Sequence, residues 1–142
     1  MTDPQQVELL RIPSSLDRLE QVDTAVERMA RAMGFNEDAC ADLGICATEA
    51  AANAILHAHK EDAGLTVEIR LERYPDRIRI AVRDHGRGFQ TETVPDPTLS
   101  ENLLKVGGRG LHVIRALMDD VQVRLLPDGV QVIMTKNLVR ES

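Results

Sequence analysis

The sequence predicts an α+β fold, in which an antiparallel or mixed sheet is covered on one face by helices. Two kinds of hydrophobic spacing alternate along the 142 residues. Apolar side chains recur at three- and four-residue steps in segments 16–33, 36–59 and 107–118, which indicates helices. They recur at every second residue in segments 66–72, 78–82, 121–125 and 130–134, which indicates strands. Because the strands come as hairpins grouped with helices, the order favours α+β.

The first half of the chain supplies a strand and two helices. Residues 7–12 can form a short opening strand. Ser14 with Asp17 three residues later resembles a capping box, and Gly34 is placed to end that helix. Asn36 is the expected cap of the second helix, which runs to about His59. Its apolar stripe consists of Ala39, Leu43, Cys46, Ala47, Ala50 and Ala54.

The second half supplies two hairpins and one helix. Turn residues at 74–76 follow the strand at 66–72, and turn residues at 127–129 separate the last two strands. Residues 89–106 show little periodicity and contain two prolines, and such a stretch in a compact domain is usually functional or mobile. Four residues, Gly107 to Gly110, then open a helix.

Composition bounds the function. One domain over residues 1–142 is expected, with a core that needs no metal or disulfide. A net charge of −6 and 2% aromatic residues argue against direct nucleic-acid binding. No apolar run reaches 18 residues, so no membrane span is expected, and residues 1–4 lack the basic-then-apolar layout of a signal peptide. Cys40 and Cys46 fall about 120° apart on one helix, so they fit small buried hydrophobes in a reducing cytoplasm rather than a disulfide.

Asp84 is the first candidate for chemistry. It continues the inward series of its strand, so pleating should direct its carboxylate towards the core, where it is costly without a partner. It could simply cap a turn. However, Gly86 and Gly88 follow directly, and glycines permit close approach of the backbone to a ligand. An inward carboxylate there can accept a hydrogen bond from an amino group such as that of adenine.

Glu49 and Asn53 are the second candidates. They lie one helical turn apart, with His57 a further turn along the same side. A carboxylate beside a carboxamide offers a base and an oxygen ligand for Mg²⁺. A solvated polar edge would show the same spacing. His57 is better explained as a residue favoured at a helix end.

The glycines at 107, 108 and 110 are the third candidates. Unpaired backbone N–H groups at a helix start form an anion site, and glycines let a phosphate reach them. Lys105 and Arg109 could add positive charge or could be solvated surface residues. Glycine-rich helix starts are common, so this motif gains weight only from its order with the other two.

Together, segments 48–58, 84–89 and 107–111 resemble the N, G1 and G2 boxes of the GHKL ATPases. Within that superfamily the chain looks most like the anti-sigma-factor serine/threonine-protein kinases of the RsbW and SpoIIAB type. The Glu-x-x-x-Asn-x-x-x-His-Ala box and the run from Arg115 to Val121 carry that likeness, which spans about residues 7–137. The resemblance implies the GHKL (Bergerat) fold, a two-layer sandwich of a mixed, mostly antiparallel sheet and helices.

The resemblance also implies roles for individual residues. Glu49 would be the catalytic base, Asn53 would coordinate Mg²⁺, and Asp84 would accept from adenine. Residues 89–107 would be the ATP lid. The remaining nucleotide-binding positions it implies are Gly86, Gly88, Gly108, Arg109, Gly110 and Leu111.

The activity that follows from the resemblance is ATP-dependent phosphorylation of a protein. The implied substrate is a Ser or Thr of a STAS-domain anti-anti-sigma protein, and the other partner is a sigma factor held inactive by a homodimeric, cytoplasmic kinase. The cofactors are ATP and Mg²⁺. Three alternatives stand beside this hypothesis: a non-catalytic ATP-binding switch module, a detached histidine-kinase domain, and a small domain without a ligand.

Overall fold

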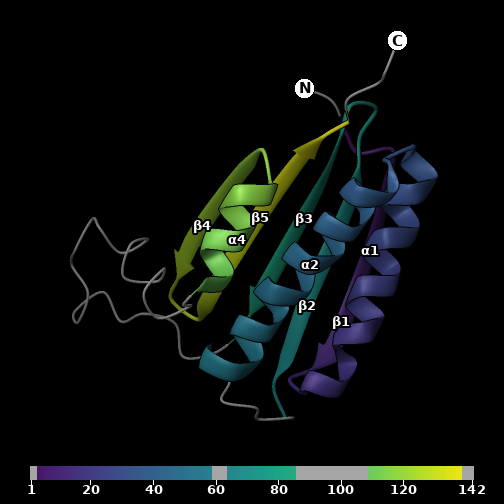
Figure 1. The fold of residues 1–142 in the computed structure, drawn as a ribbon. Helices are drawn as coiled ribbons and strands as arrows, with labels where there is room; N and C mark the ends of the chain where they lie inside the picture. The colour runs from purple at the N-terminus through teal and green to yellow at the C-terminus, as the bar shows by residue number, and fades with distance from the viewer. Residues whose placement is uncertain (1–2, 59–63, 86–108, 139–142) are drawn as a thin grey trace.

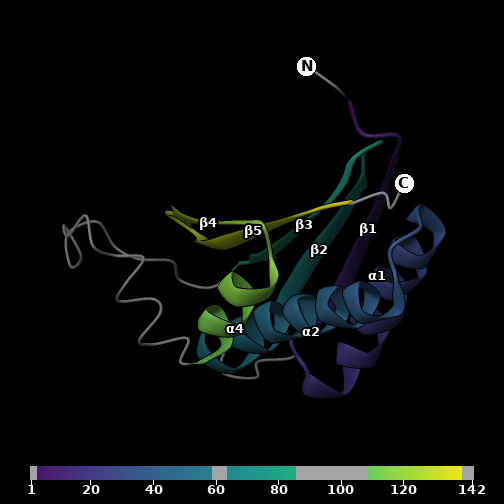
Figure 2. The same ribbon diagram turned by 45° about the horizontal axis from the view of Figure 1, so that its top comes forward.

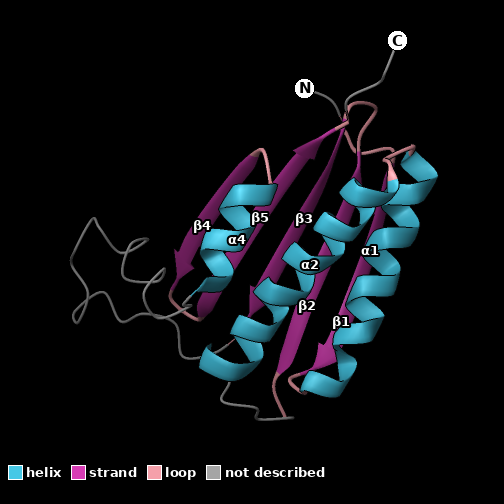
Figure 3. Ribbon diagram, viewed as in Figure 1, coloured by secondary structure: helices cyan, strands magenta, loops and turns pink. Residues whose placement is uncertain are grey.

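The computed structural model describes residues 3–58, 64–85 and 109–138 of the chain. They form two layers, with one five-stranded sheet and with helices on one of its faces (Figures 1 and 2). The strands are β1 (Gln6–Pro13), β2 (Thr66–Arg73), β3 (Arg77–Asp84), β4 (Asp120–Leu126) and β5 (Gly129–Asn137). The helices are η1 (Leu16–Arg18), α1 (Leu19–Met33), α2 (Glu37–Asn53), η2 (Ala54–Ala58) and α4 (Arg109–Leu117). Figure 3 shows this division, and it confirms the α+β prediction.

The sheet has the strand order β1-β2-β3-β5-β4, and each of these neighbouring pairs is antiparallel. The expected mixture of directions is therefore absent from the described strands. Alternate residues of the strands face the helices and are buried, as the period-two pattern predicts. On β3 the buried helix-facing residues are Ile78, Ile80 and Val82, followed by Asp84. The sheet thus carries Asp84 into the interlayer core at the end of a central strand.

The start of α1 differs from the sequence prediction. The hydroxyl of Ser15 hydrogen-bonds the carboxylate of Asp17, and no side chain caps η1 or α1. The buried Ser14 hydroxyl has no hydrogen-bond partner among the described residues. The expected capping box is therefore wrong, because Asp17 bonds to Ser15 instead of Ser14, within the 3₁₀ turn that precedes α1. The far end of α1 is as predicted, since Gly34 closes it with φ of 99°.

Helix α2 is the central helix of the helical layer, between α1 and α4 (Figure 1). The Asn36 side chain accepts a hydrogen bond of 2.8 Å from the backbone N–H of Ala39, which confirms the predicted cap. Gly44 lies so close to α1 that an added Cβ would collide with the Asp23 carboxylate. Cys40 and Cys46 are buried free thiols, and burial raises the pKa of Cys46 to about 11. Both cysteines therefore act as core side chains.

Helix residues Glu37–Leu56 are long and apolar enough, by length and composition alone, to cross a membrane. Half of that window is buried inside the domain. A core helix packed against a sheet needs the same apolar composition. The packing of α2 against α1, α4 and β3 accounts for its hydropathy.

Candidate functional site

The described parts of the three sequence motifs, residues 48–58, 84–85 and 109–111, lie at one end of the two-layer domain. The carboxyl end of α2, the end of β3 and the start of α4 lie close together in Figure 1. Helix α2 packs against both α4 and β3, and η2 also contacts β3. Polar side chains from both layers are therefore available to one ligand.

Asp84 is the buried acid of this end. It is only 6% exposed, and Asp84 and Ser14 are the buried polar residues among the described ones. Its Oδ1 accepts a hydrogen bond of 3.2 Å from the backbone N–H of Val130, the second residue of β5. The predicted inward orientation is confirmed. This bond holds the Asp84 carboxylate at the end of β3 against the start of β5.

Gly129 shapes the backbone beside Asp84, a role that the sequence analysis did not predict. It has φ of +153°, a conformation that favours glycine. A Cβ at this position would collide with the Asp84 carbonyl oxygen and lie 2.9 Å from Asp84 Oδ1. Glycine is therefore required for β5 to come close enough to donate its N–H to the carboxylate. The turn signal at 127–129 was the only sequence clue.

An ion pair on the other face of the sheet fixes the same turn. Arg83 Nη2 donates to Asp128 Oδ1 at 2.6 Å, and the Arg83 side chain is 16% exposed. The hydrogen bond from Arg83 lowers the pKa of the Asp128 carboxyl. Residues 83 and 128 adjoin Asp84 and Gly129, so the pair joins the end of β3 to the β4–β5 turn. The Asp84 carboxylate is thus positioned from both faces of the sheet.

Glu49 and Asn53 occupy the last turns of α2. Both side chains are half-buried, and i,i+4 spacing places them on the same side of the helix. Within the part of the chain that the structure describes, neither side chain forms a hydrogen bond or ion pair. By contrast, the hydroxyl of the adjacent Thr48 bonds back to the carbonyls of Gly44 and Ile45 at 2.9 and 3.0 Å. Glu49 and Asn53 are therefore polar groups with capacity for a ligand.

The helix continues past Asn53 in a form that the sequence did not predict. Ala54–Ala58 is π-helical, a conformation that often occurs at functional sites. His57 belongs to this segment. The apolar stripe persists into it, with Ala54 and Ile55 buried. Packing therefore holds the end of the helix against the sheet.

Helix α4 begins at Arg109, as the glycine-rich segment predicts. Its first four backbone N–H groups have no partner within the helix, which makes this end electropositive. Gly110 belongs to this first turn, and Leu111 is 5% exposed in the core. Gly86, Gly88, Gly108 and the expected lid over residues 89–107 lie outside the described residues.

The family is decided by comparison with known proteins. Residues 12–136 match the model of the histidine kinase-like ATPase domain. The serine-protein kinase RsbW of Bacillus subtilis is 34% identical over 135 residues, covering 91% of this chain and 84% of that protein. The chain belongs to the RsbW family of histidine kinase-like ATPases. The serine-protein kinase RsbW of Listeria monocytogenes is 33% identical over 135 residues, covering 89% of this chain and 84% of that protein.

Solved structures show the same fold. A structure of RsbU and RsbW domains from Mycobacterium tuberculosis matches with a TM-score of 0.68 at 18% identity, covering 98% of this chain and 34% of that one. The histidine kinase domain of a blue-light activated kinase from Erythrobacter litoralis matches with a TM-score of 0.55 at 19% identity, covering 88% and 61%. The resemblance to the GHKL fold and to RsbW-type kinases is confirmed, and with it the prediction that the chain is a protein kinase.

Proposed function

We propose that the protein binds MgATP and transfers the γ-phosphoryl group to a Ser or Thr of a STAS-domain anti-anti-sigma protein. The observation that carries this proposal is the buried Asp84 carboxylate, which faces the helical layer where α2 ends and α4 begins. Membership of the RsbW family supports the kinase activity. We propose a sigma factor as the second protein partner, held inactive by the same chain.

Asp84 would bind the adenine amino group. Its carboxylate is nearly dry, and hydrogen bonds are electrostatically stronger at low local dielectric. Asp84 would thereby distinguish adenine, which has an exocyclic donor, from a base that presents a carbonyl there. Gly86 and Gly88 would shape the rest of this pocket, and residues 89–107 would close over the nucleotide as a lid.

Glu49 and Asn53 would serve the phosphate end. Magnesium prefers oxygen ligands and retains several waters, so the Asn53 amide oxygen and phosphate oxygens fit it. Bound there, the ion would neutralise charge on the transferring phosphoryl group. Glu49 would accept the proton of the attacking hydroxyl. The absence of a protein partner on either side chain, within the described residues, supports these roles.

The start of α4 would hold the phosphates. Backbone N–H groups of Gly108, Arg109, Gly110 and Leu111 would donate to phosphate oxygens, and the helix dipole favours an anion at this end. The Arg109 guanidinium would add positive charge. Little covalent chemistry is required of the protein, because phosphoryl transfer depends mainly on positioning and electrostatics.

The proposal also includes the oligomeric state and the cellular compartment of this kinase. One domain over residues 1–142, working as a homodimer in the cytoplasm without direct contact to nucleic acid or membrane, fits the RsbW family. The anti-anti-sigma and sigma partners would bind as proteins.

Mass spectrometry tests the activity. The full chain is mixed with MgATP and a STAS-domain anti-anti-sigma protein, and the STAS protein should gain one phosphoryl group on Ser or Thr. ATP-dependent binding of the STAS protein without a phosphorylated product would instead support a non-catalytic nucleotide switch. An acid-labile product on His would reject the Ser/Thr assignment.

A further inference from the structure

The outward face of helix α2 carries an exposed apolar side chain near the proposed site. Ile45 is 46% exposed, whereas Leu43, two residues earlier, is fully buried. Ala41, one turn earlier on the same side as Ile45, is also exposed. Glu49 lies one turn later, and i,i+4 side chains are about 6 Å apart. The apolar surface at Ile45 therefore adjoins the carboxylate that we propose as the catalytic base.

Two carboxylates of α1 lie over α2 beside Ile45. Gly44 makes room for them, because an added Cβ there would collide with the Asp23 carboxylate and lie 3.3 Å from Glu27 Cγ. The hydrogen bond with Asp23 raises the pKa of the Glu27 carboxyl. Asp42, one turn before Ile45 on α2, is half-buried and forms no ion pair with another described residue. Carboxylates from both helices therefore flank Ile45, and a positive group beside Asp23 and Glu27 would relieve their repulsion.

Helices α1 and α2 are strongly acidic as a pair. They contain seven acidic residues and two arginines, a net charge of −5, compared with −6 for the whole chain. Both arginines already have partners, Arg28 with Glu8 at 2.8 Å and Arg31 with Glu37 at 3.1 Å. The two arginines of α4 reduce the net charge of the three helices only to −3. The helical layer therefore concentrates the negative charge of the protein.

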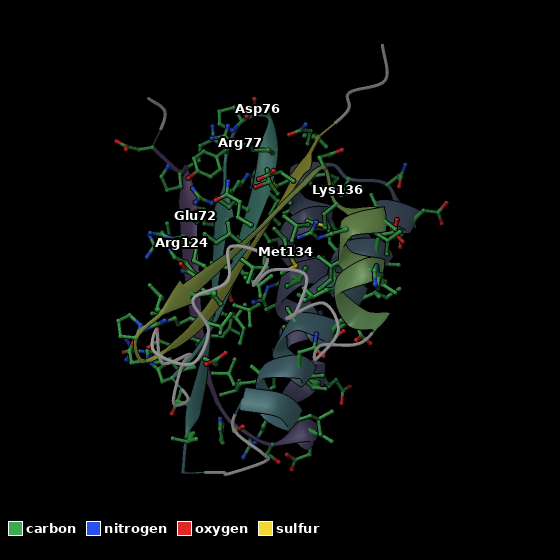
Figure 4. The ribbon with its side chains drawn as sticks, turned by 90° about the vertical axis from the view of Figure 1, so that its left-hand side faces the viewer. Glu72, Asp76, Arg77, Arg124, Met134 and Lys136 are labelled. Carbon is green, nitrogen blue, oxygen red and sulfur yellow. The ribbon has the colours of Figure 1, made fainter. Side chains whose placement is uncertain are left out.

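The sheet does not neutralise this charge from below. By register, its helix-facing charged residues are two acids and two bases: Glu8, Asp84, Arg73 and Lys136. Figure 4 shows Lys136 pointing towards the helical layer, whereas Arg124 lies on the opposite face of the sheet. The Lys136 ammonium donates to the Leu117 carbonyl at 2.9 Å, so it is engaged with α4. The outward face of α1 and α2 therefore remains acidic, and charge complementarity selects a basic partner for it.

We propose that this acidic face of α1 and α2 docks the acceptor protein through basic side chains that flank an apolar one. This role rests on the proposed function, in which the acceptor hydroxyl reaches Glu49. About two residues of extended chain span the distance from Glu49 to Ile45. The segment next to the acceptor Ser or Thr would therefore cover Ile45, and its arginines or lysines would pair with Asp23, Glu27 and Asp42.

Three other occupants fit this face less well. A second copy of the chain would bring the same negative charge together from both sides. Nucleic acid is repelled by that charge as well. Among the described residues, no group of three or more His, Cys, Asp or Glu side chains could hold a metal ion. A basic protein segment is therefore the occupant that the face favours.

Steady-state phosphorylation of a STAS-domain anti-anti-sigma protein by the full chain tests this docking face. The docking variant is Asp42→Asn with Ile45→Ala, which removes one carboxylate and one exposed apolar side chain and leaves the proposed catalytic residues in place. The matched control is Asp120→Asn with Leu9→Ala, which makes the same kinds of change at exposed residues of the sheet. Calorimetry with MgATP checks that each variant folds and binds nucleotide.

The docking variant should raise the KM for the STAS protein about tenfold and leave kcat within about twofold of the wild type. Contacts to the bound substrate are lost in this variant, whereas the reacting groups are unchanged. The control should change this KM by less than about twofold. Added salt should raise the KM of the wild type more than that of the docking variant, because salt screens the ionic contacts that the variant has lost.

Phosphoryl transfer by the wild type with the same KM in both double variants would overturn the docking face and leave the proposed kinase function standing. An absence of transfer by the wild type would reject the proposed function, and the docking face with it. A wild-type dimer in sedimentation that the docking variant converts to monomer would assign the face to a second copy instead.

Discussion

The polar side chains at the two ends of helix α2 differ in whether they have hydrogen-bond partners within the described residues. At the amino end, Asn36 caps the helix through Ala39, and Arg31 donates two hydrogen bonds of 3.1 Å to the Glu37 carboxylate. These bonds lower the pKa of the Glu37 carboxyl. At the carboxyl end, the half-buried side chains of Glu49 and Asn53 have no such partners among the described residues. The protein itself satisfies the polar side chains at the amino end, whereas those at the carboxyl end can bind a ligand.

This difference separates stability from function along a single helix. Between the two ends, the buried residues of α2 are the same kind of small or aliphatic side chain, so packing does not distinguish them. Substitutions at the amino end should therefore change the free energy of unfolding. Substitutions at the carboxyl end should change binding and catalysis and leave unfolding almost unaltered.

The largest expected effect is that of Glu49→Gln on phosphoryl transfer. Removing a general base should slow transfer by about 10²- to 10⁴-fold. Radiolabelled transfer to the STAS protein under single-turnover conditions measures this rate, and calorimetry checks that ATP still binds. A transfer rate equal to that of the wild type would exclude Glu49 as the base.

Leu43→Ala should show the largest effect on folding. The Leu43 side chain is fully buried in the middle of α2, and such a truncation costs about 2–5 kcal/mol. Urea unfolding followed by circular dichroism measures the loss. Ile45→Ala is the control, because Ile45 is 46% exposed on the same helix and should cost much less.

Asn53→Ala should weaken the binding of MgATP by about tenfold or more, since a buried ligand contact is lost. Its free energy of unfolding should stay within about 0.5 kcal/mol of the wild type, the usual range where no protein contact is removed. Titrations with and without magnesium separate the two effects. Equal losses under both conditions would argue against a role in holding the ion.

Asn36→Ala reverses this pattern with the smallest effect. Loss of the cap should lower the free energy of unfolding by about 1 kcal/mol. MgATP affinity should not change, because Asn36 lies at the far end of α2. A drop in affinity comparable to that of Asn53→Ala would show that the two ends are not independent.

The sequence predicted what local physical chemistry determines. Apolar periodicity located α2, and strand alternation turned Asp84 inward. The sequence analysis did not predict Gly129 as a neighbour of Asp84. That contact joins residues 45 apart and depends on the pairing of β3 with β5. The capping box failed because Ser15 and Asp17 bond to each other in a tight turn. The π-helical turns after Asn53 likewise depend on packing that no short-range pattern records.

Calorimetric titration with ATP and magnesium tests the central claim most directly, when the wild-type chain is compared with Asp84→Asn. We expect one ATP per chain for the wild type. The variant should bind about tenfold or more weakly, because the carboxamide exchanges an acceptor for a donor facing the adenine amino group. Binding of ATP with unchanged affinity by Asp84→Asn, or no uptake of adenine nucleotide by the wild type, would contradict a nucleotide site built around this carboxylate.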